Sequence, residues 1–103
     1  MQENFAVVLQ DGVTVYRTPP ISSAAAITFD FSRLSRPADM VTFELYLCFT
    51  AFATVTFESI TLDWLNGKEP NLTQNNTLTK ILTFRNKNPG DFSRWIASME
   101  GGY

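Results

Sequence analysis

The chain has 103 residues, which is enough for one domain and too short for a second hydrophobic core. Hydrophobic residues make up 45% and charged residues 17%, a composition that excludes a disordered chain or a coiled coil. The net charge of −2 argues against a nucleic-acid-binding domain, and the absence of histidine removes histidine-dependent nucleophiles and the usual zinc sites.

The residue types favour strands over helices. Val, Ile, Thr, Phe, Tyr and Trp form more than a third of the chain, and they prefer a pleated, half-buried surface. A single cysteine, Cys48, excludes a disulfide within the chain, and no secretory leader is recognisable, so we expect folding in a reducing cytosol. No run of 18 apolar residues occurs, which excludes a transmembrane helix.

The first 20 residues predict an N-terminal hairpin. Residues 5–9 and 13–17 are strand-like and flank Asp11-Gly12, a pair that supplies the positive φ of a tight hairpin turn. Pro19 and Pro20 then end the pairing, because proline has no N–H to donate to a ladder.

Two stretches of strict alternation follow and supply most of the expected core. Residues 25–31 place one set of side chains on a shared face: Ala25, Ile27, Phe29 and Phe31. Residues 40–49 alternate for longest, which predicts a central strand, because a helical period would scatter these side chains around its axis. The inward set there is Val41, Phe43, Leu45, Leu47 and Phe49, and the outward set includes Thr42, Glu44, Tyr46 and Cys48.

Residues 53–65 predict strands whose phase changes. Ala53, Val55 and Phe57 share a face, whereas after Glu58-Ser59 the shared face is formed by Ile60, Leu62 and Trp64. Such a change indicates either a bulge or a corner at which the chain leaves one sheet for the other.

The last third predicts a polar loop over 65–76 and strands over 78–85 and 92–98, with a turn at Asn88-Pro89-Gly90 and a flexible end over 99–103. In the first of these strands Leu78, Leu82 and Phe84 face the core and Lys80 lies at its rim. Seven or eight short strands are typical of an all-β, two-layer antiparallel β-sandwich, jelly-roll or Ig-like, formed by residues 1–103 as one domain.

No motif in the sequence carries catalysis, so we expect no catalytic, cofactor-binding or metal site. The acidic residues are spread along the chain, and solvated positions on alternating strands explain them better than a catalytic carboxylate pair does. An enzyme that used scattered carboxylates would need a cleft with two perturbed acidic side chains. Cys48 is expected to pack as a small side chain rather than react.

Three aromatic residues are the candidate ligand or interface contacts. If Ile96 faces inward, Trp95 faces outward and needs cover from a neighbouring chain or a loop, and Tyr46 faces outward by the same alternation. Trp64 and Trp95 are also candidates for stacking on a sugar ring, although tryptophan in a sandwich more often belongs to a core or an interface.

Residues 25–97 resemble a β-sandwich module common at the ends of bacteriophage tail, fibre and appendage proteins. The similarity is carried by the order of these features along the chain. Strands over 26–31, 40–49 and 53–57 are followed by a strand that ends in Trp64 and by Gly67 and Pro70, and then by a polar loop, a strand ending in Phe84, a turn and Trp95. Members typically have a proline directly after the first tryptophan, where this chain has Leu65, and a Gly-Gly turn before the second.

The resemblance implies a non-enzymatic virion component that mediates assembly or host attachment. Such proteins are usually homo-oligomers and often trimers, and their partners are other virion proteins or a host surface glycan. It implies location in the virion after assembly in the host cytoplasm, with no nucleic-acid partner and no membrane insertion. A carbohydrate-binding module that uses an exposed tryptophan is the alternative, and both functions can hold together.

Overall fold

Alternating apolar side chains and turn residues divide the chain into short strands. The computed structural model describes residues 3–34, 41–51, 53–67, 69–74 and 77–99, which contain nine strands and one 3₁₀ turn. The elements are β1 (Glu3–Val8), β2 (Val15–Arg17), β3 (Ala25–Asp30), β4 (Thr42–Phe49), β5 (Ala53–Phe57), β6 (Thr61–Trp64), η1 (Leu65–Gly67), β7 (Thr73–Gln74), β8 (Leu78–Asn86) and β9 (Arg94–Met99).

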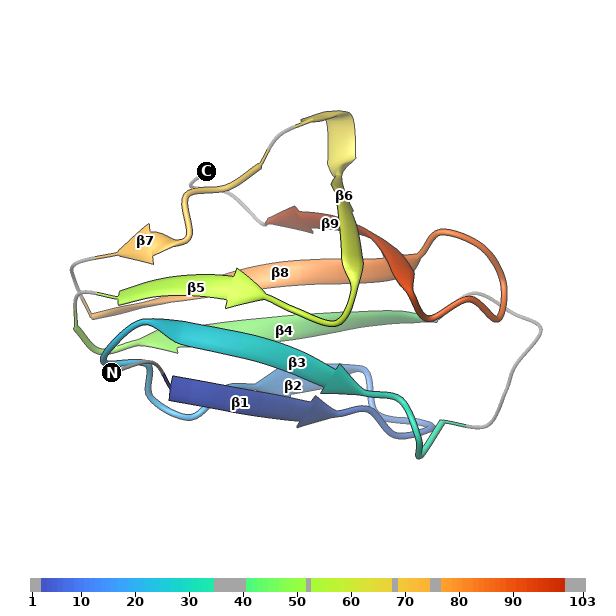
Figure 1. Cartoon of the computed structure of the whole chain (residues 1–103), viewed down its shortest axis with the longest axis horizontal. Coiled ribbons are helices and arrows are strands. Elements are labelled where there is room, and N and C mark those ends of the chain that lie inside the picture. Colours follow the sequence, from blue (N-terminus) through green and yellow to red (C-terminus); the bar gives the residue numbers. More distant parts are fainter. Residues whose placement is uncertain (1–2, 35–40, 52, 68, 75–76, 100–103) are drawn as a thin grey trace.

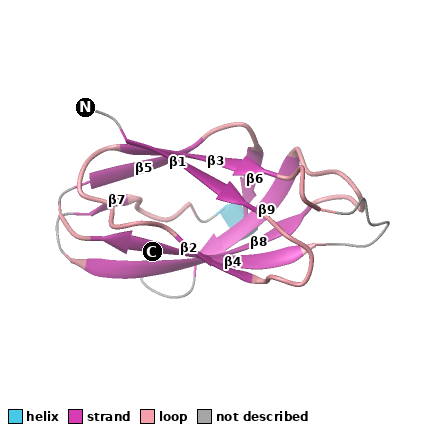
Figure 2. Ribbon diagram, turned by 90° about the horizontal axis from the view of Figure 1, so that it is seen from below, coloured by secondary structure: helices cyan, strands magenta, loops and turns pink. Residues whose placement is uncertain are grey.

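The strands form two sheets that pack face to face. One sheet has the order β1-β3-β5-β7 and the other β2-β4-β8-β9-β6. Figure 2 shows the two layers, with β1, β3 and β5 in one and β2, β4 and β8 in the other. The expected all-β fold with two packed layers is therefore confirmed, with more strands than the seven or eight predicted.

From β1 to β8 successive strands alternate between the two sheets, and only β8 and β9 fold back within one sheet as an antiparallel pair among the described residues. β1, β3 and β5 are parallel neighbours in the first sheet, and β2 and β4 are parallel neighbours in the second (Figure 1). Four of the seven strand pairs among the described residues are parallel. The expectation of antiparallel sheets is therefore wrong, and a jelly-roll or Ig-like arrangement is not confirmed.

The predicted N-terminal hairpin is also wrong. β1 pairs with β3 and β2 pairs with β4, so the turn at Asp11-Gly12 joins two sheets as an arch. Gly12 does adopt the positive φ expected of it, +82°. The arch is held by Tyr16, whose hydroxyl accepts a hydrogen bond from Gln10 N at 2.9 Å and lies 2.9 Å from the carbonyl of Val13. A tight turn suits either geometry, and these side-chain bonds favour the arch.

The alternation in β4 is confirmed, and it places this strand inside its sheet between β2 and β8. Phe43, Leu45, Leu47 and Phe49 are all buried, and each contributes about 1.5–3 kcal/mol to the free energy of unfolding. The inward residues of β3 and β5 meet them from the other sheet, and those that are fully covered are Ala25, Ile27, Phe29, Ala53 and Val55. Met40 lies outside the described residues.

The phase change after β5 is a corner, one of the two structures expected there. β5 belongs to the four-stranded sheet and β6 to the five-stranded sheet. Ser59, between them, has a φ of +71°, a conformation that turns the chain sharply.

The C-terminal strands complete the core. Leu82 and Phe84 of β8 are fully buried as predicted, and Leu78 is half-buried at the end of the strand. Met99 is the buried last residue of β9, so the predicted flexible end begins too early, and residues 100–103 lie outside the described residues. Asn86 is also buried: it has the inward parity of Leu82 and Phe84 and lies one residue beyond the predicted end of that strand.

Candidate functional site

Trp95 is the first candidate contact, and its predicted outward orientation is wrong. The side chain is 0% exposed, with its indole N–H bonded to the carbonyl of Phe92 at 2.8 Å. Phe31 stacks on the ring at 5.6 Å between centroids, and Phe43 meets it edge-on at 5.3 Å. With these neighbours around the ring, Trp95 belongs to the core of a single chain and offers no platform to a ligand.

The reason for the error lies just before β9. Asp91 accepts hydrogen bonds from both the amide and the hydroxyl of Ser93, which forms a local turn. Phe92 therefore precedes the strand, and its position does not set the phase of the residues that follow. From Arg94 onward the inward set is Trp95, Ala97 and Met99, and Ile96 is only half-buried.

Tyr46 faces outward, as its position in the alternation predicts. It is half-buried on the outer face of β4, where Arg17 of the neighbouring β2 covers its ring at 5.1 Å from the centroid. A guanidinium over an aromatic face is an attractive cation–π contact. Arg17 therefore occupies one side of the ring, and the proposed role of Tyr46 in a contact stays a prediction.

Trp64, the third candidate, lines a groove of about 310 Å³ between β5 and β6. Side chains from both sheets form its walls, among them Val55, Phe57, Leu62, Trp64, Glu69 and Leu72. β7 pairs only with Ala53 and Thr54, and Val55 N donates to the carbonyl of Leu72 at 3.0 Å, so the groove lies beyond the point at which this short pairing ends. The face shared by Ile60, Leu62 and Trp64 is thus confirmed, and it is half-buried rather than closed.

The turn after Trp64 shapes one end of this groove. Asn66 and Gly67 have φ values of +58° and +70°, so the sharp turn predicted at this pair is confirmed. No atom lies within 4 Å of a Cβ placed on Gly67, so glycine is needed there for its backbone conformation and not for space. Pro70, between the groove residues Glu69 and Leu72 in the sequence, is buried.

The chemistry of the groove is mixed. Trp64 supplies an aromatic surface, Thr56 a hydroxyl and Glu69 a carboxylate, and the remaining walls are aliphatic or aromatic. An aromatic ring beside a few hydrogen-bonding groups suits a sugar, whose C–H face is apolar and whose rim is polar.

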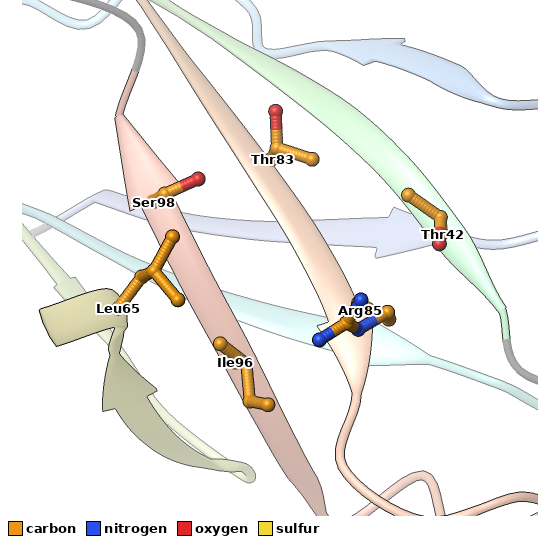
Figure 3. Close-up of a pocket in the computed structure, with 6 residues that line it drawn as sticks. All are labelled: Thr42, Leu65, Thr83, Arg85, Ile96 and Ser98. Carbon is orange, nitrogen blue, oxygen red and sulfur yellow. The ribbon is translucent and has the colours of Figure 1, made fainter.

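A second pocket, of about 190 Å³, lies on the outer face of the five-stranded sheet and was not foreseen. Figure 3 shows Leu65 of η1 reaching over β9 beside Ile96, with Arg85 on the neighbouring strand β8. Its remaining lining residues carry hydroxyls: Thr42, Thr83 and Ser98. Arg85 and Ile96 are cross-strand partners, so the register of β8 and β9 creates this pocket, and periodicity alone does not reveal register.

The acidic residues show only local interactions. Hydrogen bonds from Ser32 hold the pKa of Asp30 below its ordinary value, and bonds from Ser93 do the same for the pKa of Asp91. Lys87 donates a 2.9 Å hydrogen bond to Asp63 and lowers the pKa of that carboxyl. Each of the two pockets above is lined by fewer than two acidic side chains.

Among the residues that the structure describes, no cluster of three or more Cys, Asp or Glu side chains could bind a metal ion. In the same part of the chain, no helix has the length and apolarity required to cross a bilayer. No protein-family model, curated protein sequence or solved structure matches this chain.

Proposed function

We propose that the chain is a non-enzymatic structural component of a bacteriophage virion, a tail, fibre or appendage module that mediates assembly or host attachment. The resemblance of residues 25–97 to such modules motivates this function. The observation that supports it best is a closed two-layer core that carries a bare strand edge at one border and a groove at the other. A rigid body with binding surfaces at its borders suits assembly into a larger particle.

The packing of the interior supports a rigid module. Phe29, Phe43, Phe84 and Trp95 contact one another at centroid distances from 5.0 to 5.8 Å, across both sheets. Aromatic contacts of this kind add about 0.5–1.5 kcal/mol per pair beyond burial of their area. We place the protein in the virion, after assembly in the host cytoplasm, in homo-oligomeric form and beside other virion proteins.

The direct test is mass spectrometry of purified phage particles from the organism that carries the sequence. We expect peptides of this chain in particles at a constant ratio to the other structural proteins, and enrichment over the host lysate. Light scattering of the purified protein should show a stable oligomer. Absence from the particles, with peptides confined to the lysate, would contradict the proposal.

Carbohydrate binding is a second candidate function, favoured by the half-buried Trp64 in its groove beside Glu69. A glycan array should show binding that the Trp64→Ala variant loses. Leu65→Ala is the matched control, because Leu65 is the next residue, is exposed and lies outside the groove lining. No glycan bound by the unchanged protein, or equal binding by both variants, would eliminate this function. Trp95 has no place in the test, because it is buried in the core.

A further inference from the structure

The free edge of β1 has hydrogen-bonding capacity that no strand uses in the described part of the chain. β1 is the first strand in the order β1-β3-β5-β7, so one of its sides is the border of the sheet (Figure 1). Glu3 N and Leu9 N donate to the carbonyls of Ala24 and Asp30, which directs the odd-numbered residues toward β3. Because the direction alternates along a strand, the N–H and C=O groups of Asn4, Ala6 and Val8 point outward.

The other sheet borders are protected in ways that β1 is not. β2 has three residues, carries Arg17 and runs into Pro19-Pro20, which cannot donate to a ladder. β7 has two residues and β6 has four, and η1 follows β6 at once. β1 has six residues with neither proline nor a basic side chain, and natural proteins use such groups to keep edges from pairing.

The sequence of β1 is complementary to itself in the antiparallel direction. If Ala6 of one copy lies opposite Ala6 of another, then Asn4 lies opposite Val8, and each of these pairs exchanges two backbone hydrogen bonds. Glu3 then lies opposite Leu9, so no like charges meet. On the outer face of the sheet, the side chain at the centre of the two paired β1 strands is the exposed methyl group of Ala6. No bulky side chain at this position therefore hinders the approach of the second copy.

We propose that two copies of this chain associate through antiparallel pairing of their β1 strands about a two-fold axis at Ala6. The four-stranded sheets then join into one continuous sheet of eight strands. On the inner face, the half-buried Phe5 meets Val7 of the other copy and is covered by it. This inference rests on the proposed function, which includes a homo-oligomer, and it identifies the interface of that oligomer. The interface has two-fold rather than three-fold symmetry.

The first test uses charges placed at the two-fold axis. Ala6→Lys brings two ammonium groups face to face, so we expect the dissociation constant of the dimer to rise at least tenfold in sedimentation equilibrium. Ala6→Glu should have a similar effect, and an equimolar mixture of the two variants should recover a heterodimer. Thr61→Lys is the matched control, since Thr61 is exposed on β6 at the opposite border and its substitution should leave the dimer intact.

The second test uses the unchanged protein and needs no variant to fold. In the dimer, the amides of Asn4, Ala6 and Val8 should be protected from hydrogen exchange together with those of Phe5 and Val7. Dilution below the dissociation constant should release only the even-numbered amides, because the odd-numbered ones remain bonded to β3. Circular dichroism of each lysine and glutamate variant checks that the monomer is folded.

The outcomes separate this interface from the proposed function. A monomer at all accessible concentrations, a trimer, or a dimer that resists Ala6→Lys and loses stability with Thr61→Lys would overturn the β1 pairing. Fast exchange of Asn4, Ala6 and Val8 in the associated protein would do the same, because it would show that this edge is unpaired and that the copies meet elsewhere. A β1-paired dimer that is absent from phage particles would support the interface and contradict the virion role.

Discussion

The two lateral borders of the sandwich are open in different ways. At the β1 border Val7 and Leu9 are buried and the backbone edge is bare, while a pocket of about 280 Å³ lies beside the Asp11-Gly12 arch. At the β6–β7 border short strands occupy the edges, and the gap between the sheets is open as a groove beside Trp64. The first border offers backbone hydrogen bonds, and the second offers side chains.

This difference indicates two kinds of partner for one small domain. A bare backbone edge suits another strand, because its donors and acceptors repeat at the spacing of a sheet. A groove with an aromatic wall and a carboxylate suits a small ligand with one apolar face. Under the proposed function, assembly and attachment would use separate surfaces, so a variant at one border should leave the other function intact.

The largest expected effect comes from the two tryptophans. Trp95→Ala removes a fully buried ring and should lower the free energy of unfolding by about 3–5 kcal/mol. Trp64→Ala removes a half-buried ring from the groove wall and should cost roughly 1 kcal/mol, since much of that surface already meets water. Urea denaturation followed by far-ultraviolet circular dichroism measures both. Equal losses would show that the groove is closed in solution.

Alanine substitution of one leucine at each border should give a smaller difference in the free energy of unfolding in the same direction. Leu9 is 1% exposed beside β1, and Leu9→Ala should cost about 2–4 kcal/mol because it leaves a cavity. Leu62 is half-buried in the groove, and Leu62→Ala should cost less than about half as much, because water and neighbouring side chains can fill the space. A larger loss for Leu62→Ala in the same denaturation series would reverse the assignment of closed and open borders.

One glycine lies in a turn at each border, and alanine substitution should lower the free energy of unfolding equally at both. This comparison tests whether the two borders differ in side-chain packing while their turns are equally strained. Gly12 and Gly67 have φ values of +82° and +70°, and neither has an atom within 4 Å of an added Cβ. Gly12→Ala and Gly67→Ala should therefore each cost about 1 kcal/mol, the strain of a left-handed alanine. A loss above about 3 kcal/mol at either position, measured by thermal unfolding, would indicate crowding that the structure does not contain.

The smallest expected effect on stability comes from the exposed ion pair between Lys87 and Asp63 of β6. The hydrogen bond and charge of Lys87 hold the pKa of Asp63 below 3.8, so this pair stabilises the fold above that pH and the contribution is lost as the pH falls through the lowered pKa. Lys87→Gln should raise the pKa of Asp63 toward 3.8 and leave that of Asp30, which Ser32 sets, unchanged. Carboxylate NMR titration distinguishes the two, and a simultaneous change at Asp30 would reveal a wider rearrangement.

The alternation of side chains predicted the strands but not their partners. The inward residues of β4 follow directly from period two, because one face of the strand meets the core. The pairing of β1 with β3 does not follow, because Asp11-Gly12 suits a hairpin and an arch equally. Strand order depends on which edges meet in space, and periodicity contains no information about that.

The orientation of a candidate site residue could be predicted only where the inward–outward alternation continued unbroken up to that residue. Trp64 and Tyr46 lie where their alternation places them, whereas Trp95 does not, because the turn formed by Asp91 and Ser93 resets the phase before β9. Asn86 continues the inward parity of Leu82 and Phe84, but it lies one residue beyond the predicted end of that strand. Its side chain donates a local bond to Asn88 O at 2.8 Å and accepts one from Val41 N at 2.7 Å, and only the second contact depends on the pairing of β4 with β8.

The most direct test of the central claim, that β1 pairs with β3 on one side and with a second copy on the other, is an isotope-filtered NOE experiment. Equal amounts of labelled and unlabelled protein are mixed above the dissociation constant of the dimer. We expect an intermolecular NOE between the Hα protons of Phe5 and Val7, together with intramolecular contacts between β1 and β3. Intermolecular contacts that involve other strands only, or antiparallel contacts between β1 and β2 within one chain, would contradict it.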